Sequence, residues 1–158
     1  MRKNEVLFIF TGIILTVLLI YDYSEYFFQV ESIKKLDVIL NSIKLYRFNE
    51  SIFVNASIGI GGNGVKTIKI LMITYKIFFD NDLVREYTEN FALKGFKVQP
   101  GQIFVRKISL KIPYFKYSKH LYNASIKGVL VVDIYVDTFF GKALSSYRFN
   151  FIVTKPNI

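Results

Sequence analysis

Side chains that could carry catalysis or bind metals are few in this sequence. His120 is the only histidine and there is no cysteine, so one chain cannot form a His–His metal pair, a Cys–His dyad or a thiolate site. Asp133 and Asp137 lie four residues apart, which separates their Cα atoms by about 13 Å along a strand. That spacing is wide for paired catalytic carboxylates, and we expect both on an exposed strand face. The sequence therefore predicts no catalytic residue, metal site or cofactor.

Two short motifs resemble ligand sites but are better explained as turns. Asp80-Asn81-Asp82 places three oxygen-bearing side chains in a row, as a calcium loop does, yet Asx residues also stabilise tight turns. Gly61-Gly62-Asn63-Gly64 is rich in glycine, but a phosphate-binding loop needs Gly-Lys-Ser/Thr before a helix. Here Val65-Lys66-Thr67 leads into a strand instead. We interpret both motifs as turns.

The densest candidate for binding is an aromatic and basic stretch late in the chain. Lysines alternate there with rings, an arrangement that binds glycans, lipid headgroups or single-stranded nucleic acid. Its members are Lys111, Tyr114, Phe115, Lys116, Tyr117, Lys119 and Tyr122. The alternative is a long connection whose aromatic rings cover one end of a core.

Three N-x-S sequons begin at Asn49, Asn55 and Asn123. We treat these asparagines as candidate glycosylation sites, because such tripeptides accept glycans in secreted proteins. Asn55 falls on the polar face of its predicted strand, and the other two fall near loops. The sequons agree with a location outside the cytoplasm.

The candidate residues above lie in or between short stretches in which apolar and polar residues alternate. From Ser51 to Ile60, and again from Ile103 to Ile112, apolar and polar residues alternate with period two, as in half-buried strands. Further strands are predicted at Leu36–Phe48, Leu83–Tyr87, Phe91–Val98, Ser125–Thr138 and Ser145–Val153. In Ser125–Thr138, the residues expected to face the core include Leu130, Val132, Ile134 and Val136. Val65–Phe79 changes phase midway, which predicts a β-bulge. Seven or eight strands without a long intervening helix predict an all-β fold, an antiparallel β-sandwich.

The stretch from about Leu36 to Val153 resembles the late-embryogenesis-abundant β-sandwich family, also called the water-stress and hypersensitive-response domain. The resemblance rests on Ile68–Phe79 leading into Asn81-Asp82-Leu83-Val84, on Val98-Gln99-Pro100-Gly101-Gln102 before the Ile103 strand, and on Gly128 and Gly141 around a long hairpin. Family members often carry Asn-Pro where Asn63-Gly64 stands here. The resemblance implies a seven-stranded immunoglobulin-like sandwich with one short helix and a non-enzymatic role.

The chain begins with Arg2 and Lys3 and then runs uncharged from Val6 to Tyr21. Sixteen helical residues span about 24 Å, slightly less than the ~30 Å of a hydrocarbon core, and aromatic residues extend the segment to about Tyr26. We expect residues 1–28 to be a cytoplasmic tip and a transmembrane signal anchor. Basic residues precede the run and acidic ones follow it, so the N-terminus is expected in the cytoplasm and residues 29–158 outside it.

Three other interpretations of the apolar run remain open. A cleaved signal peptide fits the basic start, but no A-x-A-like site follows the run. A core helix of a soluble protein would need protein on every side. In a pilus-like filament, the helix would pack against its copies, although Lys3-Asn4-Glu5-Val6 lacks the small residue that the processing peptidase expects.

Composition agrees with one basic outer domain. The formal charge is +9, and 16 Phe and 11 Tyr accompany many Ile and Val residues. The scattered lysines are interpreted as solubilising rather than as a concentrated anion site. We expect a single-pass, non-enzymatic membrane protein with a binding or envelope-structural role. Its expected partners are membrane lipid and envelope proteins, glycans or anionic headgroups, and not nucleic acid; a pilus-like filament subunit is the alternative.

Overall fold

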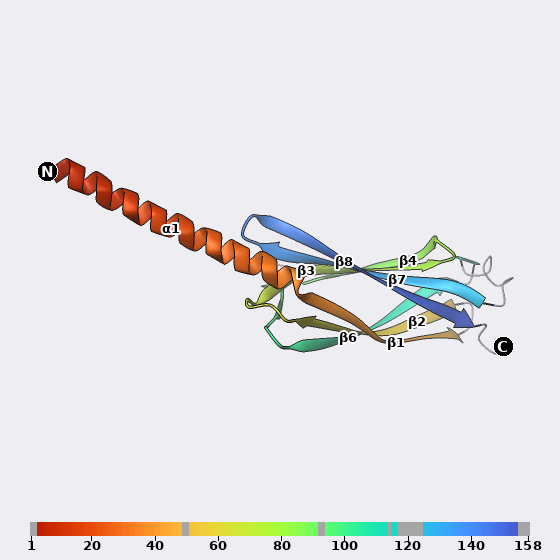
Figure 1. Cartoon of the computed structure of the whole chain (residues 1–158). Coiled ribbons are helices and arrows are strands. Elements are labelled where there is room, and N and C mark those ends of the chain that lie inside the picture. The colour runs from red at the N-terminus through yellow and green to blue at the C-terminus, as the bar shows by residue number, and fades with distance from the viewer. Residues whose placement is uncertain (1–2, 49–50, 92–93, 114, 117–124, 155–158) are drawn as a thin grey trace.

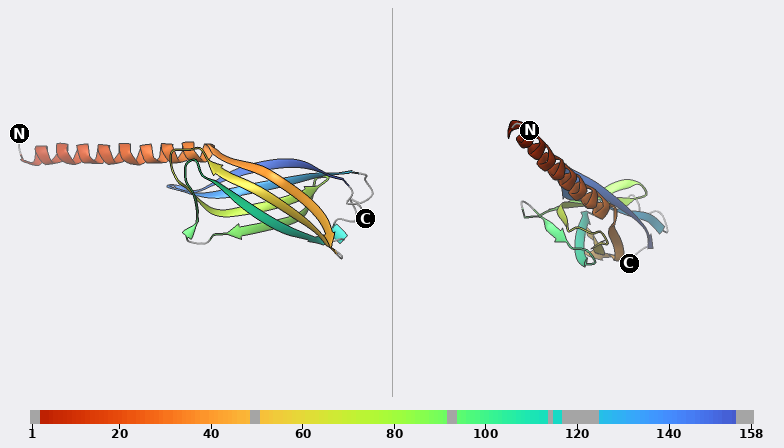
Figure 2. Two further views of the ribbon diagram at one scale, coloured as in Figure 1. Left: turned by 90° about the horizontal axis from the view of Figure 1, so that it is seen from below. Right: turned by 60° about the vertical axis from the view of Figure 1, so that its left-hand side comes forward.

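The computed structural model describes residues 3–48, 51–91, 94–113, 115–116 and 125–154. One long helix, α1 (Lys3–Lys34), projects from one end of two β-sheets that lie face to face (Figure 1). Two further views show α1 continuing roughly along the long axis of this sandwich (Figure 2). We call the end next to α1 the proximal end and the opposite end, which carries the Asp80–Asn81 turn, the distal end.

Eight strands form the two sheets within the described residues. The first sheet has the order β1-β2-β6, from β1 (Leu36–Phe48), β2 (Ser51–Gly62) and β6 (Ile103–Pro113). The second has the order β4-β3-β7-β8, from β3 (Ile68–Phe79), β4 (Asp82–Asn90), β7 (Ser125–Thr138) and β8 (Gly141–Thr154), with β5 (Phe96–Val98) paired to the start of β3. All pairs are antiparallel, which confirms the predicted all-β fold after one N-terminal helix.

Period-two alternation places the core between the sheets. On β2 the alternate residues Ile52, Val54, Ala56, Ile58 and Ile60 are buried, as predicted. On β7 the buried set includes Leu130, Val132, Ile134 and Val136, also as predicted. Burying these branched side chains stabilises the fold by removing apolar area from water, at about 25 cal/mol per Å².

The predicted irregularity in β3 is confirmed. Its pairing with β7 shifts register between Ile70 and Met72, and its pairing with β4 shifts between Ile77 and Phe78. The first shift lets both Ile70 and Ile73 point into the core, although they are an odd number of residues apart.

An ion pair joins the edge strands of the two sheets. The guanidinium of Arg106 on β6 donates to a carboxylate oxygen of Glu89 on β4 at 2.6 Å. The same guanidinium lies over the rings of Phe91 and Phe96, 5.3 and 5.8 Å from their centroids. The hydrogen bond to Glu89 raises the pKa of Arg106. The pair closes this side of the sandwich.

Asp133 is not on an exposed strand face, and that part of the sequence prediction is wrong. Asp133 is only 5 % exposed, because side chains of the neighbouring strands cover it. Lys76 on β3 donates to one carboxylate oxygen at 2.8 Å, and the hydroxyl of Ser146 on β8 donates to the other at 2.6 Å. The hydrogen bond that Lys76 donates to Asp133 raises the pKa of Lys76. Asp133 is therefore a cross-strand tie in the centre of the second sheet.

Several elements differ in length from their predictions. The strand predicted at Val65–Phe79 begins only at Ile68, while β4 and β8 are longer than the predicted Leu83–Tyr87 and Ser145–Val153. The stretch predicted as a strand over Phe91–Val98 is a strand only over Phe96–Val98, where it pairs with Ile68–Ile70. The helix continues to Lys34, well beyond the apolar run, and β1 begins at Leu36. The last helical turns therefore lie against the sandwich rather than ahead of it.

Candidate functional site

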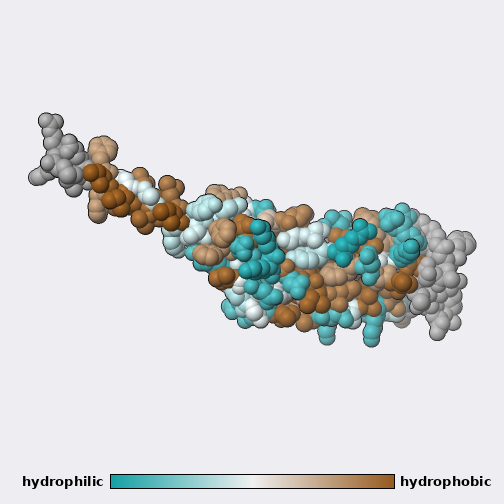
Figure 3. All heavy atoms as spheres, in the orientation of Figure 1, coloured by the Kyte–Doolittle hydropathy of each residue, from teal (hydrophilic) through white to brown (hydrophobic). Residues whose placement is uncertain are grey.

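The projecting part of α1 presents apolar side chains on all sides. Every residue from Leu7 to Tyr23 is exposed, and Figure 3 shows hydrophobic surface along the helix outside the sandwich. The segment Leu7–Lys34 contains an 18-residue window with a mean hydropathy of 1.9, enough in length and composition to cross a membrane. A helix of this kind can be a membrane anchor or a signal sequence.

The two threonine hydroxyl groups in the apolar run are satisfied within the helix. Thr11 donates to the carbonyl of Leu7, and Thr16 donates to the carbonyl of Gly12, both at 2.9 Å. Hydroxyls bonded to the preceding turn need no partner outside the helix. This part of α1 can therefore enter an apolar environment without losing a hydrogen bond.

A serine in the last turns of α1 fixes the helix to the sandwich. The hydroxyl oxygen of Ser32 accepts the backbone N–H groups of Val65 and Lys66 at 3.1 and 2.9 Å, while its own hydrogen is donated to Phe28. Ser32 is fully buried. The loop between β2 and β3 thus uses a helix side chain as the acceptor for two of its amides.

Gly64 permits this close approach. A Cβ atom added at Gly64 would lie 2.4 Å from the Cα of Ser32, a distance that no side chain tolerates. Gly61 and Gly62 lie in β2, so only Asn63 and Gly64 of the predicted turn belong to the loop between β2 and β3. In that loop, Gly64 lets the backbone reach the helix. Sequence reasoning identified the turn but not the contact, since nothing in the pattern linked it to Ser32.

Gln29 joins α1 to the hairpin between β7 and β8. Its side-chain amide donates to the carbonyl of Asp137 at 3.1 Å and accepts the backbone N–H of Phe139 at 3.0 Å. One turn earlier, the ring of Tyr26 meets the ring of Phe140 edge-on, with centroids 4.9 Å apart. The helix is therefore held by two different loops of the proximal end.

An ion pair adds to this junction on the helix side. Lys66 donates to a carboxylate oxygen of Glu25 at 2.7 Å. The hydrogen bond that Lys66 donates to Glu25 raises the pKa of Lys66. Both side chains are partly exposed, so the pair contributes little to stability in water. Its main consequence is local, because it pairs the charge of Glu25.

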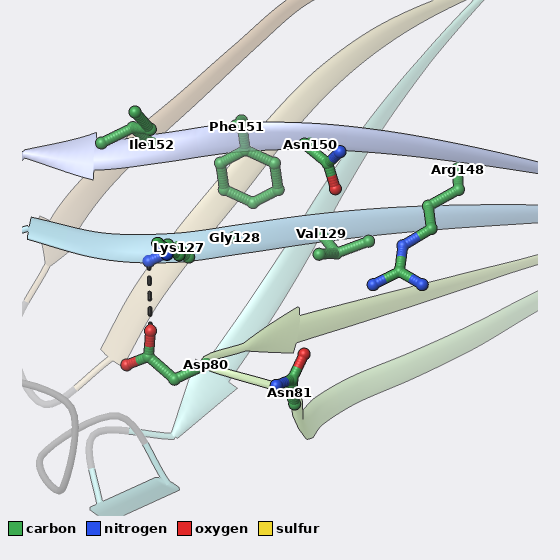
Figure 4. A pocket seen from close by; sticks show the side chains of 9 residues that line it. All are labelled: Asp80, Asn81, Lys127, Gly128, Val129, Arg148, Asn150, Phe151 and Ile152. Atoms are coloured by element: carbon green, nitrogen blue, oxygen red, sulfur yellow. Dashed lines mark hydrogen bonds between the residues drawn. The ribbon is translucent and has the colours of Figure 1, made fainter.

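The distal end carries a hollow of about 830 Å³ on the outer side of the second sheet. Lys127 and Arg148 bring two cationic side chains to it, and Figure 4 shows Arg148 extending over β7 beside Val129. Asp80 forms two hydrogen bonds with the backbone of Lys127. The backbone N–H of Asp80 donates to the carbonyl of Lys127 at 2.9 Å, and the carboxylate of Asp80 accepts from the backbone N–H of Lys127 at 3.2 Å. Asp80 and Asn81 have positive φ angles, so the predicted Asx turn is the role found here.

The predicted aromatic and basic stretch is described only in part. Lys111 at the end of β6 and the neighbouring Phe115 and Lys116 are exposed. The remaining predicted members, Tyr114, Tyr117, Lys119 and Tyr122, lie outside the described residues, as does His120.

The first sheet adds aromatic rings to this stretch that the sequence pattern did not indicate. Lys111 faces Phe53 across the β2–β6 pair, and Phe53 faces Tyr46 across the β1–β2 pair. The rings of Tyr46 and Phe53 stack at 5.3 Å with an angle of 10° between their planes. We call Tyr46, Phe53 and Lys111 the distal aromatic row.

Among the candidate glycosylation sites, only Asn55 is described. It lies in the middle of β2, half-buried on the outer face of the first sheet, between Lys44 on β1 and Ser109 on β6. A shallow hollow surrounds it. Asn49 and Asn123 lie outside the described residues. Whether any of the three carries a glycan stays a prediction.

Solved structures share this fold at low sequence identity. A protein from Archaeoglobus fulgidus matches with a TM-score of 0.55 and 16% identity, over 76% of this chain and all of that one. A protein from Arabidopsis thaliana matches at 0.60 and 11%, over 77% and 82% of the two chains. A protein assigned to the late embryogenesis abundant (LEA) group matches at 0.59 and 12%, over 98% and 90%. No protein-family model and no curated protein matches the sequence.

The junction predicts a specific effect of Ser32→Ala. The variant removes the acceptor of two partly buried N–H groups, which costs about 1–3 kcal/mol for each group left unsatisfied. We expect the amides of Val65 and Lys66 to exchange hydrogen much faster in the full-length protein. Ser24→Ala is the matched control, because the Ser24 hydroxyl bonds only to Tyr21 within the helix. Equal exchange at both amides in the two variants would contradict this account of the junction.

Proposed function

We propose that this chain is a single-pass membrane protein whose N-terminus lies in the cytoplasm and whose sandwich stands on the outer membrane face. The sandwich is proposed to be an immunoglobulin-like domain of the LEA type with a non-enzymatic role in binding or in envelope structure. The observation that carries the proposal is one continuous helix. Its first part exposes apolar residues all round, and its last turns are bonded to the sandwich.

Charge and internal bonding support this assignment of α1. Arg2 and Lys3 precede the apolar run and Asp22 and Glu25 follow it, which is the order expected for an N-terminus in the cytoplasm. The two threonine hydroxyls of the run are bonded within the helix, as a lipid-facing helix requires.

A surface filament is the alternative arrangement of the same parts. Apolar side chains exposed around α1 could contact copies of the helix instead of lipid, and the sandwiches would then cover the filament. Processing distinguishes the two. Filament subunits of this type are cut ahead of the apolar run, so an intact N-terminus in the mature protein supports the anchor and a new one at the start of the run supports the filament.

The first test is protease treatment of intact spheroplasts that express the full-length protein. We expect the sandwich to be digested from outside, leaving a membrane-bound stub that contains α1. A cytoplasmic marker protein should survive in the same sample. A sandwich that is protected until the cells are lysed would overturn the proposal.

The distal aromatic row is the surface that we propose for binding. It lies at the end of the sandwich farthest from α1, where a partner in the envelope meets it first. Stacked rings beside a lysine suit a ligand that combines flat apolar faces with negative charge. Acidic glycans have this combination, and anionic headgroups of an opposing membrane share the charge alone.

Heparin, a sulfated glycan, is a suitable probe of this surface. We expect Lys111→Ala and Phe53→Ala to lower the salt concentration at which the solubilised full-length protein leaves a heparin column. Lys142→Ala is the matched control, because it removes the same charge from an exposed position at the proximal end. If Lys111→Ala and Lys142→Ala elute together, binding follows net charge alone and the proposed surface is wrong.

A further inference from the structure

The hairpin between β7 and β8 places two aromatic residues at its exposed tip. Phe139 is 61 % exposed and Phe140 is 75 % exposed, and their rings contact each other edge-on at 5.1 Å. Such exposure of two adjacent phenylalanines is costly in water, since each ring carries a large apolar area. The tip is also held in place, because Gln29 binds its backbone and Tyr26 packs on Phe140.

The length of α1 puts this tip at a defined depth. A hydrocarbon layer of about 30 Å takes about 20 helical residues, so a span that begins at Val6 ends near Tyr26. Tyr26 is the residue that contacts Phe140. The hairpin tip therefore lies level with the edge of the hydrocarbon layer, beside the helix that crosses it.

The surroundings of the tip match the interfacial layer of a membrane. Tyr21, Tyr23 and Phe27 expose further rings on the same part of α1, and aromatic residues are enriched at this depth. Glu25, which lines a hollow together with Gln29 and Phe139, is paired with Lys66. Val65, 63 % exposed in the loop that binds Ser32, adds an apolar side chain on the second loop held by the helix.

We propose that the β7–β8 hairpin is a second membrane contact, with Phe139 and Phe140 inserted among the lipid headgroups beside α1. This inference rests on the proposed function, because it requires α1 to span the bilayer. The contact supplements a helix whose uncharged run alone is shorter than the hydrocarbon layer. It also fixes the tilt of the sandwich, since the sandwich then meets the membrane at α1 and at the hairpin.

The protein contains no tryptophan, so a single introduced tryptophan reports on its own surroundings. Three full-length variants are reconstituted in phosphatidylcholine vesicles: Phe139→Trp at the hairpin, Phe48→Trp at the exposed distal end of β1, and Leu15→Trp in the middle of the apolar run. Each is measured with lipids brominated near the headgroup and with lipids brominated deep in the acyl chain. Far-ultraviolet circular dichroism checks that the variants are folded.

We expect headgroup-proximal bromine to remove most of the fluorescence of Trp at position 139 and to leave position 48 unchanged. The emission at position 139 should also lie at a shorter wavelength than that at position 48. Deep bromine should quench position 15. Emission at position 139 that equals that at position 48 overturns the hairpin contact, while quenching at position 15 leaves the anchor standing. A shortened wavelength without quenching also overturns it and indicates cover by protein. If brominated lipids do not quench the fluorescence of Trp at position 15, both the membrane anchor and the hairpin contact are overturned.

Discussion

The hydroxyl oxygen of Ser32 accepts hydrogen bonds from two backbone N–H groups of the β2–β3 loop. The position of the whole sandwich relative to α1 depends on this contact. An exposed apolar helix followed by a flexible linker would leave the domain free to rotate. Here Gln29 and Tyr26 add a second point of attachment one turn away, on the β7–β8 hairpin. Two attachments on different loops prevent rotation about either one. The helix and the sandwich therefore have a fixed orientation relative to each other.

This constraint divides the sandwich into two ends with different tasks. The proximal loops contain the residues that hold α1, together with the exposed rings of Phe139 and Phe140. The distal end contains the row of Tyr46, Phe53 and Lys111 and the hollow beside Arg148. Between them the sheets are held by buried branched residues and by ties such as Lys76–Asp133. In the proposed function, the core acts as a rigid spacer that presents the distal surface to the envelope.

Much of the fold could be predicted because alternation in a strand reports directly on burial. The patterns around Val54, Ile108 and Val132 identified their strands and their core faces correctly. Asp133 was misplaced, because alternation assigns a face and does not show that Lys76 and Ser146 cover that face. The junction could not be predicted, since Ser32 and Gly64 meet only in three dimensions. Tyr46 and Phe53 stack for the same reason, through strand pairing that no local pattern records.

The central claim is that α1 crosses the membrane and holds the sandwich on the outer side. Because the protein has no cysteine, single introduced cysteines can be labelled in intact cells with a membrane-impermeant maleimide. We expect Lys107→Cys, exposed on β6, to be labelled in intact cells, and Asn4→Cys to be labelled only after lysis. Labelling of position 107 only after lysis would contradict this claim.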